Sequence, residues 1–247
     1  MPQDLPPLDP ESLPQWSDIG QYLHDARENL NGPIPLFTHT ADKAIGTLVK
    51  HPSGPGTLRQ VGLINYAYSN WRSAVLLGQT GNSHQVPVVL RPAVEALGYA
   101  HLFLKEHTWQ KCWESRHKSK SAEQKFRRHA PKAARDCLKS ASPDLASRVE
   151  ELTQEFVDFG GHPNVSAVEA STSYFQNSED KDIGFVVFSQ LAGVEERYFA
   201  QLSIIRTADI FLDTFKIMRP NIYHLFNTDS LRENLHRQIK IYREQNR

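Results

Sequence analysis

The sequence has few cysteines, no long apolar run and no excess of charge of either sign. Its two cysteines, Cys112 and Cys137, are too few for a disulfide framework and indicate free thiols in a reducing compartment. No stretch of about 18 consecutive apolar residues occurs, which argues against a transmembrane helix. Because 28 basic residues balance 28 acidic residues, the whole protein has no general electrostatic attraction to nucleic acid or anionic membranes. We therefore expect a cytoplasmic protein without a membrane partner.

Most short motifs of enzymes and cofactor-binding proteins are also missing. There is no cysteine and histidine spacing typical of zinc sites, no glycine loop for phosphates, no lipase-type elbow and no dinucleotide fingerprint. The first residues lack the basic start and apolar run of a signal peptide. We accordingly expect no cofactor and no metal, and the sequence leaves open whether the protein is an enzyme.

Helical periodicity is present along most of the chain and predicts an all-α antiparallel bundle. Five prolines within residues 1–15 predict a flexible N-terminal arm, and residues 16–247 contain no linker long enough to divide them into two domains. Two β-like runs predict a small hairpin near residues 172–188. Helices are predicted at about 18–30, 41–50, 57–79, 84–105, 108–117, 122–139, 142–159, 164–170, 190–218 and 230–244.

The predicted helix at 84–105 is apolar on every side, which is typical of a buried helix. Between residues 86 and 104 its only charged side chains are Arg91 and Glu95, four residues apart and therefore able to pair on one face. Pro92 lies beside them and either kinks the helix or starts it. The pair is interpreted in two ways, as a buried ion pair that fixes the helix register or as the floor of a polar pocket. We favour the buried pair.

A second candidate is the Gly-Gly-His-Pro-Asn corner at residues 160–164. His162 precedes a proline and is therefore held in an extended conformation, and Asp158 could orient its imidazole. Such a corner either positions a histidine for chemistry or simply joins two helices, and the second reading is favoured. If a pocket exists, its predicted lining is Arg91, Glu95, Tyr99, Asp158, His162 and Asn164.

These segments carry a family resemblance. Residues 90–99, 113–116 and 158–164 resemble an uncharacterised family of bacterial all-helical proteins in which an arginine–glutamate helix precedes a glycine-histidine-proline-asparagine corner. The likeness covers roughly residues 60–215, and the family is similar in layout to HEPN-like helical bundles. Many HEPN-like proteins serve in toxin–antitoxin or defence systems. The resemblance implies such a context and assigns no activity.

Two enzyme patterns occur at the frequency expected by chance. The arginine–histidine spacing of HEPN-type ribonucleases occurs once, from Arg219 to His224, and Pro220 stands where that family has a polar residue. The Glu-x-x-His spacing of di-iron bundles occurs at Glu114 and Glu233, both in polar, basic surroundings. Neither pattern predicts a catalytic site.

Residues 105–139 are strongly basic, with eleven lysines and arginines against four acidic residues. Trp109, Trp113 and Phe126 are interleaved with these charges, a pattern that suits phosphate contact with base stacking, although a solvated face is the preferred reading. We predict a homodimeric bundle that acts by binding a protein partner or a small ligand. The alternative is a HEPN-like ribonuclease or nucleic-acid-binding protein that uses residues 105–139.

Overall fold

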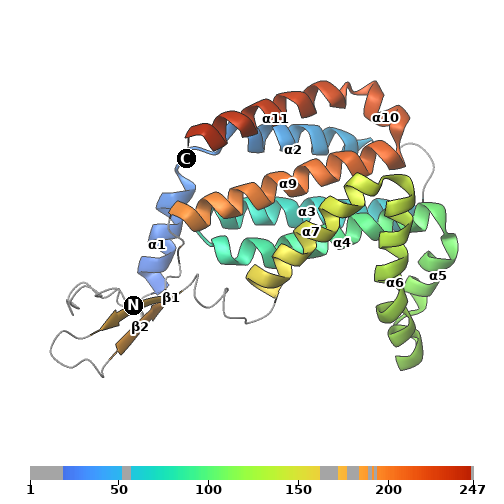
Figure 1. The fold of residues 1–247 in the computed structure, drawn as a ribbon, viewed down its shortest axis with the longest axis horizontal. Coiled ribbons are helices and arrows are strands. Elements are labelled where there is room, and N and C mark those ends of the chain that lie inside the picture. The colour runs from blue at the N-terminus through green and yellow to red at the C-terminus, as the bar shows by residue number, and fades with distance from the viewer. Residues whose placement is uncertain are drawn as a thin grey trace.

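The computed structural model describes residues 19–51, 57–161, 172–176, 184–188, 191 and 194–245. Within these ranges the protein is an all-α helical bundle with one pair of short antiparallel strands, which confirms the predicted fold class (Figure 1). The predicted N-terminal arm, the predicted helix at 164–170, and the candidate residues His162 and Asn164 lie outside the described residues.

The described elements follow one another along the chain with short connections, as expected for a bundle. Their bounds are α1 Ile19–Leu30, α2 Leu36–Lys50, α3 Leu58–Thr80, η1 Ser83–Gln85, α4 Val86–Lys105, α5 His107–Ser115, α6 Lys120–Ala141, α7 Pro143–Phe156, η2 Val157–Gly161, β1 Thr172–Gln176, β2 Gly184–Phe188, α9 Val194–Met218, α10 Pro220–Leu225 and α11 Thr228–Gln245.

Local capping explains why several helices begin and end where the sequence predicts. At the start of α3 the backbone N–H of Gln60 donates to Thr57 Oγ1, and the backbone N–H of Thr57 donates to Gln60 Oε1 in return. Gly81 ends α3 with a φ of 93°, a left-handed conformation that glycine adopts without strain. Ser142 caps α7, with Pro143 in its first turn.

Two predicted helix bounds are wrong, and one described helix was not predicted. Helix α2 begins at Leu36, whereas the predicted helix begins at about residue 41. The α-helical part of α7 ends at Phe156, and the chain continues as the π-helical turn η2. Pro220 stops α9 as predicted, but it also starts α10, because a proline fits the first turn of a helix where its missing N–H has no role.

Helix α4 lies at the centre of the bundle and packs against α3, α9, α6 and α7. Its buried residues include Leu90, Leu97 and Phe103, which explains why this segment is the most apolar of the predicted helices. Trp71 of α3 is also buried, and its Nε1 donates a hydrogen bond of 2.9 Å to the carbonyl oxygen of Ile204 on α9. None of the described helices is long and apolar enough to cross a membrane.

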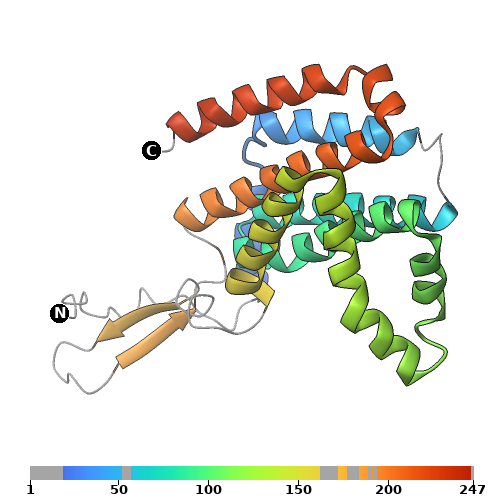
Figure 2. The ribbon, with the colours of Figure 1, turned by 45° about the vertical axis from the view of Figure 1, so that its right-hand side comes forward.

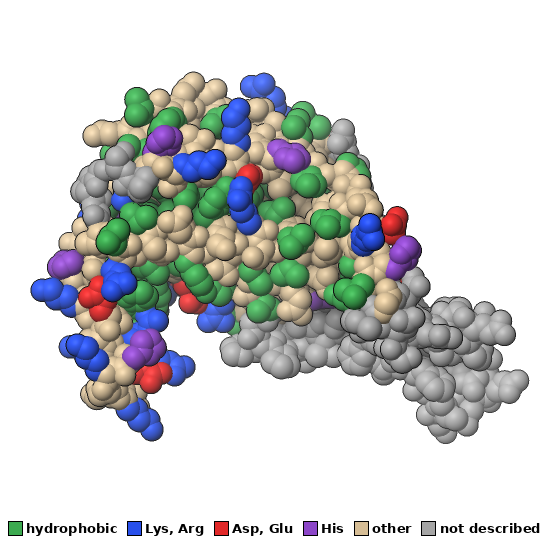
Figure 3. All heavy atoms as spheres, turned by 180° about the vertical axis from the view of Figure 1, so that it is seen from behind, with side chains coloured by type: hydrophobic (Ala, Val, Ile, Leu, Met, Phe, Trp, Pro, Cys, Tyr) green, Lys and Arg blue, Asp and Glu red, His purple; other side chains and the backbone are tan. Residues whose placement is uncertain are grey.

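Helices α5 and α6 project from one end of the bundle, while α6 also packs against α4 and α7 (Figures 1 and 2). We call residues 107–141, which contain these two helices, the basic arm. The space-filling view in Figure 3 shows lysine and arginine side chains over most of its length. The α4-facing side of α6 instead carries buried apolar residues, among them Phe126 and Leu138, which join the arm to the core.

Candidate binding groove

A groove of about 770 Å³ lies between α4, α6 and α7, where the basic arm leaves the bundle. Its walls are residues 91–99 of α4, 126–138 of α6 and 146–154 of α7. This volume is in the range of known ligand pockets. We call it the basic groove because five of its lining residues are arginine or lysine and two are glutamate.

Three predicted pocket residues lie on one wall of the basic groove. Arg91, Glu95 and Tyr99 all belong to α4, and each of them lines the groove. Their spacing of four residues per step places them on one side of the helix. The three residues therefore share one wall of the groove.

Of the other predicted pocket residues only Asp158 is described, and it is not part of this lining. Asp158 lies on η2, and its Oδ1 accepts a hydrogen bond of 2.9 Å from Nε2 of Gln154, which does line the groove. His162 and Asn164 fall outside the described residues. That His162 and Arg91 line one pocket therefore stays a prediction.

The Arg91–Glu95 pair forms, but the prediction that it is buried is wrong. Arg91 Nε donates to Glu95 Oε1 at 3.0 Å, and the two side chains keep 35% and 44% of their surface exposed. Most apolar residues of α4 are buried against neighbouring helices, whereas this strip faces the groove. The pair is thus part of a groove wall. Pro92 lies inside α4 and does not start it.

The floor of the basic groove is apolar. Val94 of α4, Ala134 and Leu138 of α6, and Ala146 of α7 line it and are buried, while Val149 of α7 is half-buried. Side chains of this kind offer a ligand apolar contact and no hydrogen bond. Binding at the floor is therefore favoured only for a ligand that has an apolar part.

The cations along α6 are only partly neutralised. Arg135 donates to Glu150 at 2.9 Å, and Arg127 approaches Glu123 at 3.5 Å. Arg128 and Lys132 are exposed on the lining and form no ion pair with the described residues. The groove therefore presents positive charge that an anion could neutralise.

The aromatic side chains of the groove are already covered by other groups. The rings of Tyr99 and Phe126 lie with centroids 5.4 Å apart. The guanidinium of Arg116 lies over Phe126 at 5.8 Å and over Trp113 at 4.6 Å. Burial, together with the charge of Glu95, raises the pKa of Tyr99 to about 12, so its hydroxyl stays protonated at neutral pH. These rings are therefore already engaged in contacts within the protein.

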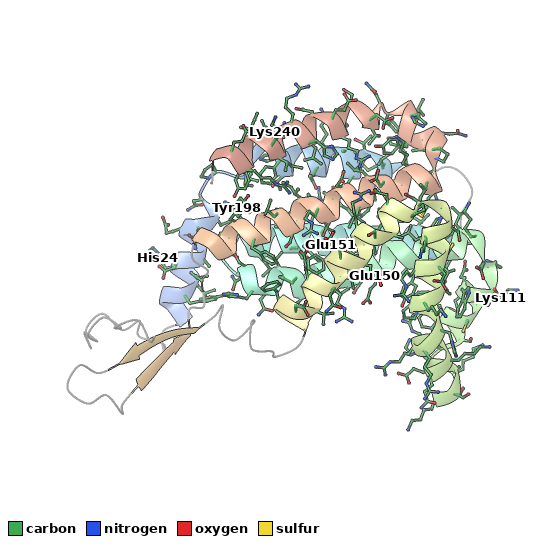
Figure 4. The ribbon with its side chains drawn as sticks, viewed as in Figure 1. His24, Lys111, Glu150, Glu151, Tyr198 and Lys240 are labelled. Atoms are coloured by element: carbon green, nitrogen blue, oxygen red, sulfur yellow. The ribbon has the colours of Figure 1, made fainter. Side chains whose placement is uncertain are left out.

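A second hollow, of about 620 Å³, lies on the other side of α7, between α7, α9 and α11. Glu150 and Glu151, neighbours on α7, face different hollows (both residues are labelled in Figure 4). Glu150 lines the basic groove and pairs with Arg135 of α6, whereas Glu151 lines the second hollow and lies 3.6 Å from Arg206 of α9. Helix α7 is therefore a wall shared by both.

A dense cluster of charged residues, which the sequence did not predict, lies at the second hollow and shares Arg148, Asp209 and His236 with its lining. Asp209 accepts hydrogen bonds of 2.7 Å from Arg148 and 2.8 Å from Arg232, and His236 Nε2 lies 2.8 Å from its Oδ1. Asp213 pairs with the same two arginines. We call these five residues the aspartate cluster, and it joins α7, α9 and α11.

The aspartate cluster is saturated with internal partners. Burial by itself would raise the pKa of Asp209, but the hydrogen bonds and charges of Arg232 and His236 outweigh it and lower the pKa. The carboxylate is therefore charged at neutral pH and cannot serve as a proton donor. One pattern in the sequence could have indicated this cluster. Asp209 and Asp213 lie four residues apart within an otherwise apolar stretch of helix.

The enzyme patterns considered from the sequence do not assemble into sites. Arg219 is buried, whereas the side chain of His224 is 57% exposed and lies 3.4 Å from Asp229. Glu114 accepts hydrogen bonds from Arg59 and from Gln110. Within the described part of the chain, no group of three histidine, cysteine or acidic residues is arranged to hold a metal ion.

One buried histidine lies between α4 and α6. His101 is fully buried, and its Nδ1 is 3.8 Å from the sulfur of Cys137. Burial, with the nearby Lys105, lowers the pKa of His101 to about 4, and burial with Glu106 raises the pKa of the Cys137 thiol. Both groups are neutral at pH 7, so the pair does not supply an activated thiolate.

Comparison of the chain with protein-family models, with curated proteins and with solved structures finds no match. The resemblance to HEPN-like bundles therefore stays a prediction, and the function must be argued from the geometry of the chain itself.

Proposed function

We propose that this protein acts by binding and that the basic groove receives an anionic ligand with an apolar part. The observation that carries this proposal is that Arg128 and Lys132 flank an apolar floor without a carboxylate partner among the described residues. An apolar floor favours burial of a hydrocarbon or ring, and cations at the rim orient a negative group. The reducing cytoplasm stays our proposed location, and the HEPN-like resemblance makes a defence role the context to examine first.

The test uses 1-anilinonaphthalene-8-sulfonate, a fluorescent probe with an aromatic body and one sulfonate. The double variant Arg128→Glu/Lys132→Glu reverses the free charges of the groove, and we expect its probe affinity to fall at least about tenfold. The matched control Lys43→Glu/Arg237→Glu makes the same charge change at exposed positions of α2 and α11. Equal probe binding by the two double variants would contradict the proposal. Circular dichroism checks that both stay folded.

A second candidate function is nucleic-acid binding by the outer side of the basic arm. The specific observation in its favour is a set of exposed lysines on the arm that form no ion pair with the described residues, namely Lys111, Lys118, Lys120, Lys125 and Lys139. Binding of this kind falls steeply with salt because phosphate contacts release counterions. We would measure the affinity for single-stranded RNA between 50 and 200 mM salt, about the range over which such contacts weaken. A flat response, or no binding, would remove this candidate.

The predicted homodimer also stays a proposal. Helix α3 has only two charged residues, Arg59 and Arg72, and exposes Tyr66 and Leu76 at 52% each. Exposed apolar and aromatic side chains on a weakly charged helix suit contact with a second copy. Light scattering after size-exclusion chromatography would measure the mass, and a monomer at high concentration would contradict the proposal. The variant Tyr66→Lys should shift a dimer toward monomer.

A further inference from the structure

The shape and charge pattern of the basic groove favour one class of ligand. We propose that its occupant is an acidic amphipathic helix of a partner protein. This inference rests on the proposed function, because it assumes that the groove binds an anionic ligand, and it specifies what that ligand is.

The groove is elongated along α6. Its lining on this helix extends from Phe126 to Leu138, a distance of about 18 Å at 1.5 Å per residue. A partner helix lying along this wall would make contact over about three turns. Helix-in-groove binding of this kind uses apolar side chains one turn apart on the partner as anchors.

The cations of α6 are spaced like one face of a helix. Arg128, Lys132 and Arg135 lie at positions i, i+4 and i+7, and all three line the groove. Acidic side chains with the same spacing on a partner helix would face them one by one. Arg135 would then exchange or share its present partner Glu150, whereas Arg128 and Lys132 would gain their first carboxylate among the described contacts. Charge complementarity along three turns is therefore available.

The floor contains small residues. Gly98, Ala134 and Ala146 lie in the lining and belong to three different helices. A Cβ built on Gly98 would meet only Ala134, at an ordinary distance of 3.8 Å. Small residues allow a second helix to approach closely, and the larger Val94, Leu138 and Val149 beside them would contact its leucine or isoleucine side chains.

Nucleic acid fits this groove less well. Sequence-tolerant binding of single strands uses exposed aromatic faces on which bases stack. In the groove, Phe126 is buried, and its ring is covered by Tyr99 and by the guanidinium of Arg116. The rest of the floor is aliphatic. A helix with leucines on one side and acidic residues along its edge matches both features, whereas an RNA strand would leave the apolar floor unused.

The experiment uses a fluorescein-labelled synthetic helix of about 16 residues. It carries glutamates at i, i+4 and i+7 beside a leucine stripe, and a matched peptide has lysines in place of the glutamates. We expect the full-length protein to bind the acidic peptide and not the basic one in fluorescence anisotropy. In Arg128→Glu/Lys132→Glu the affinity for the acidic peptide should fall at least about tenfold and the affinity for the basic peptide should rise. The control Lys43→Glu/Arg237→Glu should bind both peptides as the parent protein does.

The outcomes separate the inference from the proposed function. If the groove variant loses the anilinonaphthalene sulfonate but the acidic peptide never binds, the groove is an anionic-ligand site and the helix inference is overturned. If single-stranded RNA displaces the bound peptide at lower concentration than an unlabelled copy of the peptide does, the helix inference is also overturned. If neither probe responds to the groove variant, both proposals fail. Exchange of peptide preference on charge reversal supports the inference, because a merely structural change in α6 would weaken both peptides alike.

Discussion

On one side of α7, the aspartate cluster holds its carboxylates and arginines in contact with one another, so that each charge has an internal partner. On the other side, the basic groove leaves Arg128 and Lys132 above an apolar floor without such a partner in the described part of the chain. Both surfaces are rich in ions and both are hollowed. The comparison teaches that the number of charges does not distinguish a binding surface from a structural one. What distinguishes them is whether the charges are already satisfied within the fold.

The largest effect should come from breaking the aspartate cluster. In Asp209→Ala, Arg148 and Arg232 lose a partner in a partly buried site, and we expect the free energy of unfolding to fall by about 3–5 kcal/mol. Urea denaturation followed by circular dichroism would measure it. The control Glu150→Ala, on the groove side of the same helix, removes a pair whose side chains are at least half exposed and should cost less than about 1 kcal/mol. Equal losses in the two variants would contradict the distinction.

Acidification should lower the stability of the fold in two steps, first through His101 and then through Asp209 of the aspartate cluster. His101, between α4 and α6, has a pKa of about 4 in the folded protein and 6.5 as the reference value. The unfolded chain binds this proton more readily than the folded protein does. The free energy of unfolding is therefore not reduced by His101 above pH 6.5, and it falls by up to about 3 kcal/mol as the pH drops toward 4. Asp209, whose pKa is lowered below 3.8, starts to cost stability only at still lower pH.

The variant His101→Leu separates these two contributions. It should flatten the stability profile between pH 6.5 and about 4 and leave the loss at lower pH unchanged. Urea denaturation at a series of pH values would show this. If the parent protein and the variant have parallel profiles through that range, protonation of His101 is not the cause of the loss.

The smallest effect is expected at the Arg91–Glu95 pair. Because both side chains are more than a third exposed, Arg91→Ala should change the free energy of unfolding by no more than about 0.5 kcal/mol. Thermal denaturation would measure it, with Glu95→Ala as the reciprocal variant. A loss of several kcal/mol would return this pair to the class of buried ion pairs and remove its difference from the aspartate cluster.

Local chemistry explains which parts of the fold were predictable. Thr57, Gly81 and Ser142 act on neighbouring residues through caps and a left-handed turn, so their sequence positions already contain the information. Helix α10 was missed because Pro220 was interpreted only as the end of α9, although the same ring geometry suits the first turn of a new helix.

Long-range contacts explain what could not be predicted. Arg148 and Asp209 are 61 residues apart in the sequence, and no periodicity within one helix indicates that they meet. The burial of Arg91 and Glu95 was predicted wrongly for a related reason. The apolar residues of α4 correctly indicated a central helix, but which strip of that helix the arm would leave uncovered depends on where α6 and α7 pack.

Proline in the middle of a helix gives the basic groove a property beyond charge. Pro131 lies inside α6 and lines the groove, and it has no N–H to donate to the carbonyl oxygen of Arg127, four residues earlier. Helix α6 therefore lacks one regular backbone hydrogen bond beside Arg128 and Lys132. The part of α6 that presents these cations is thus the part with the weaker backbone support.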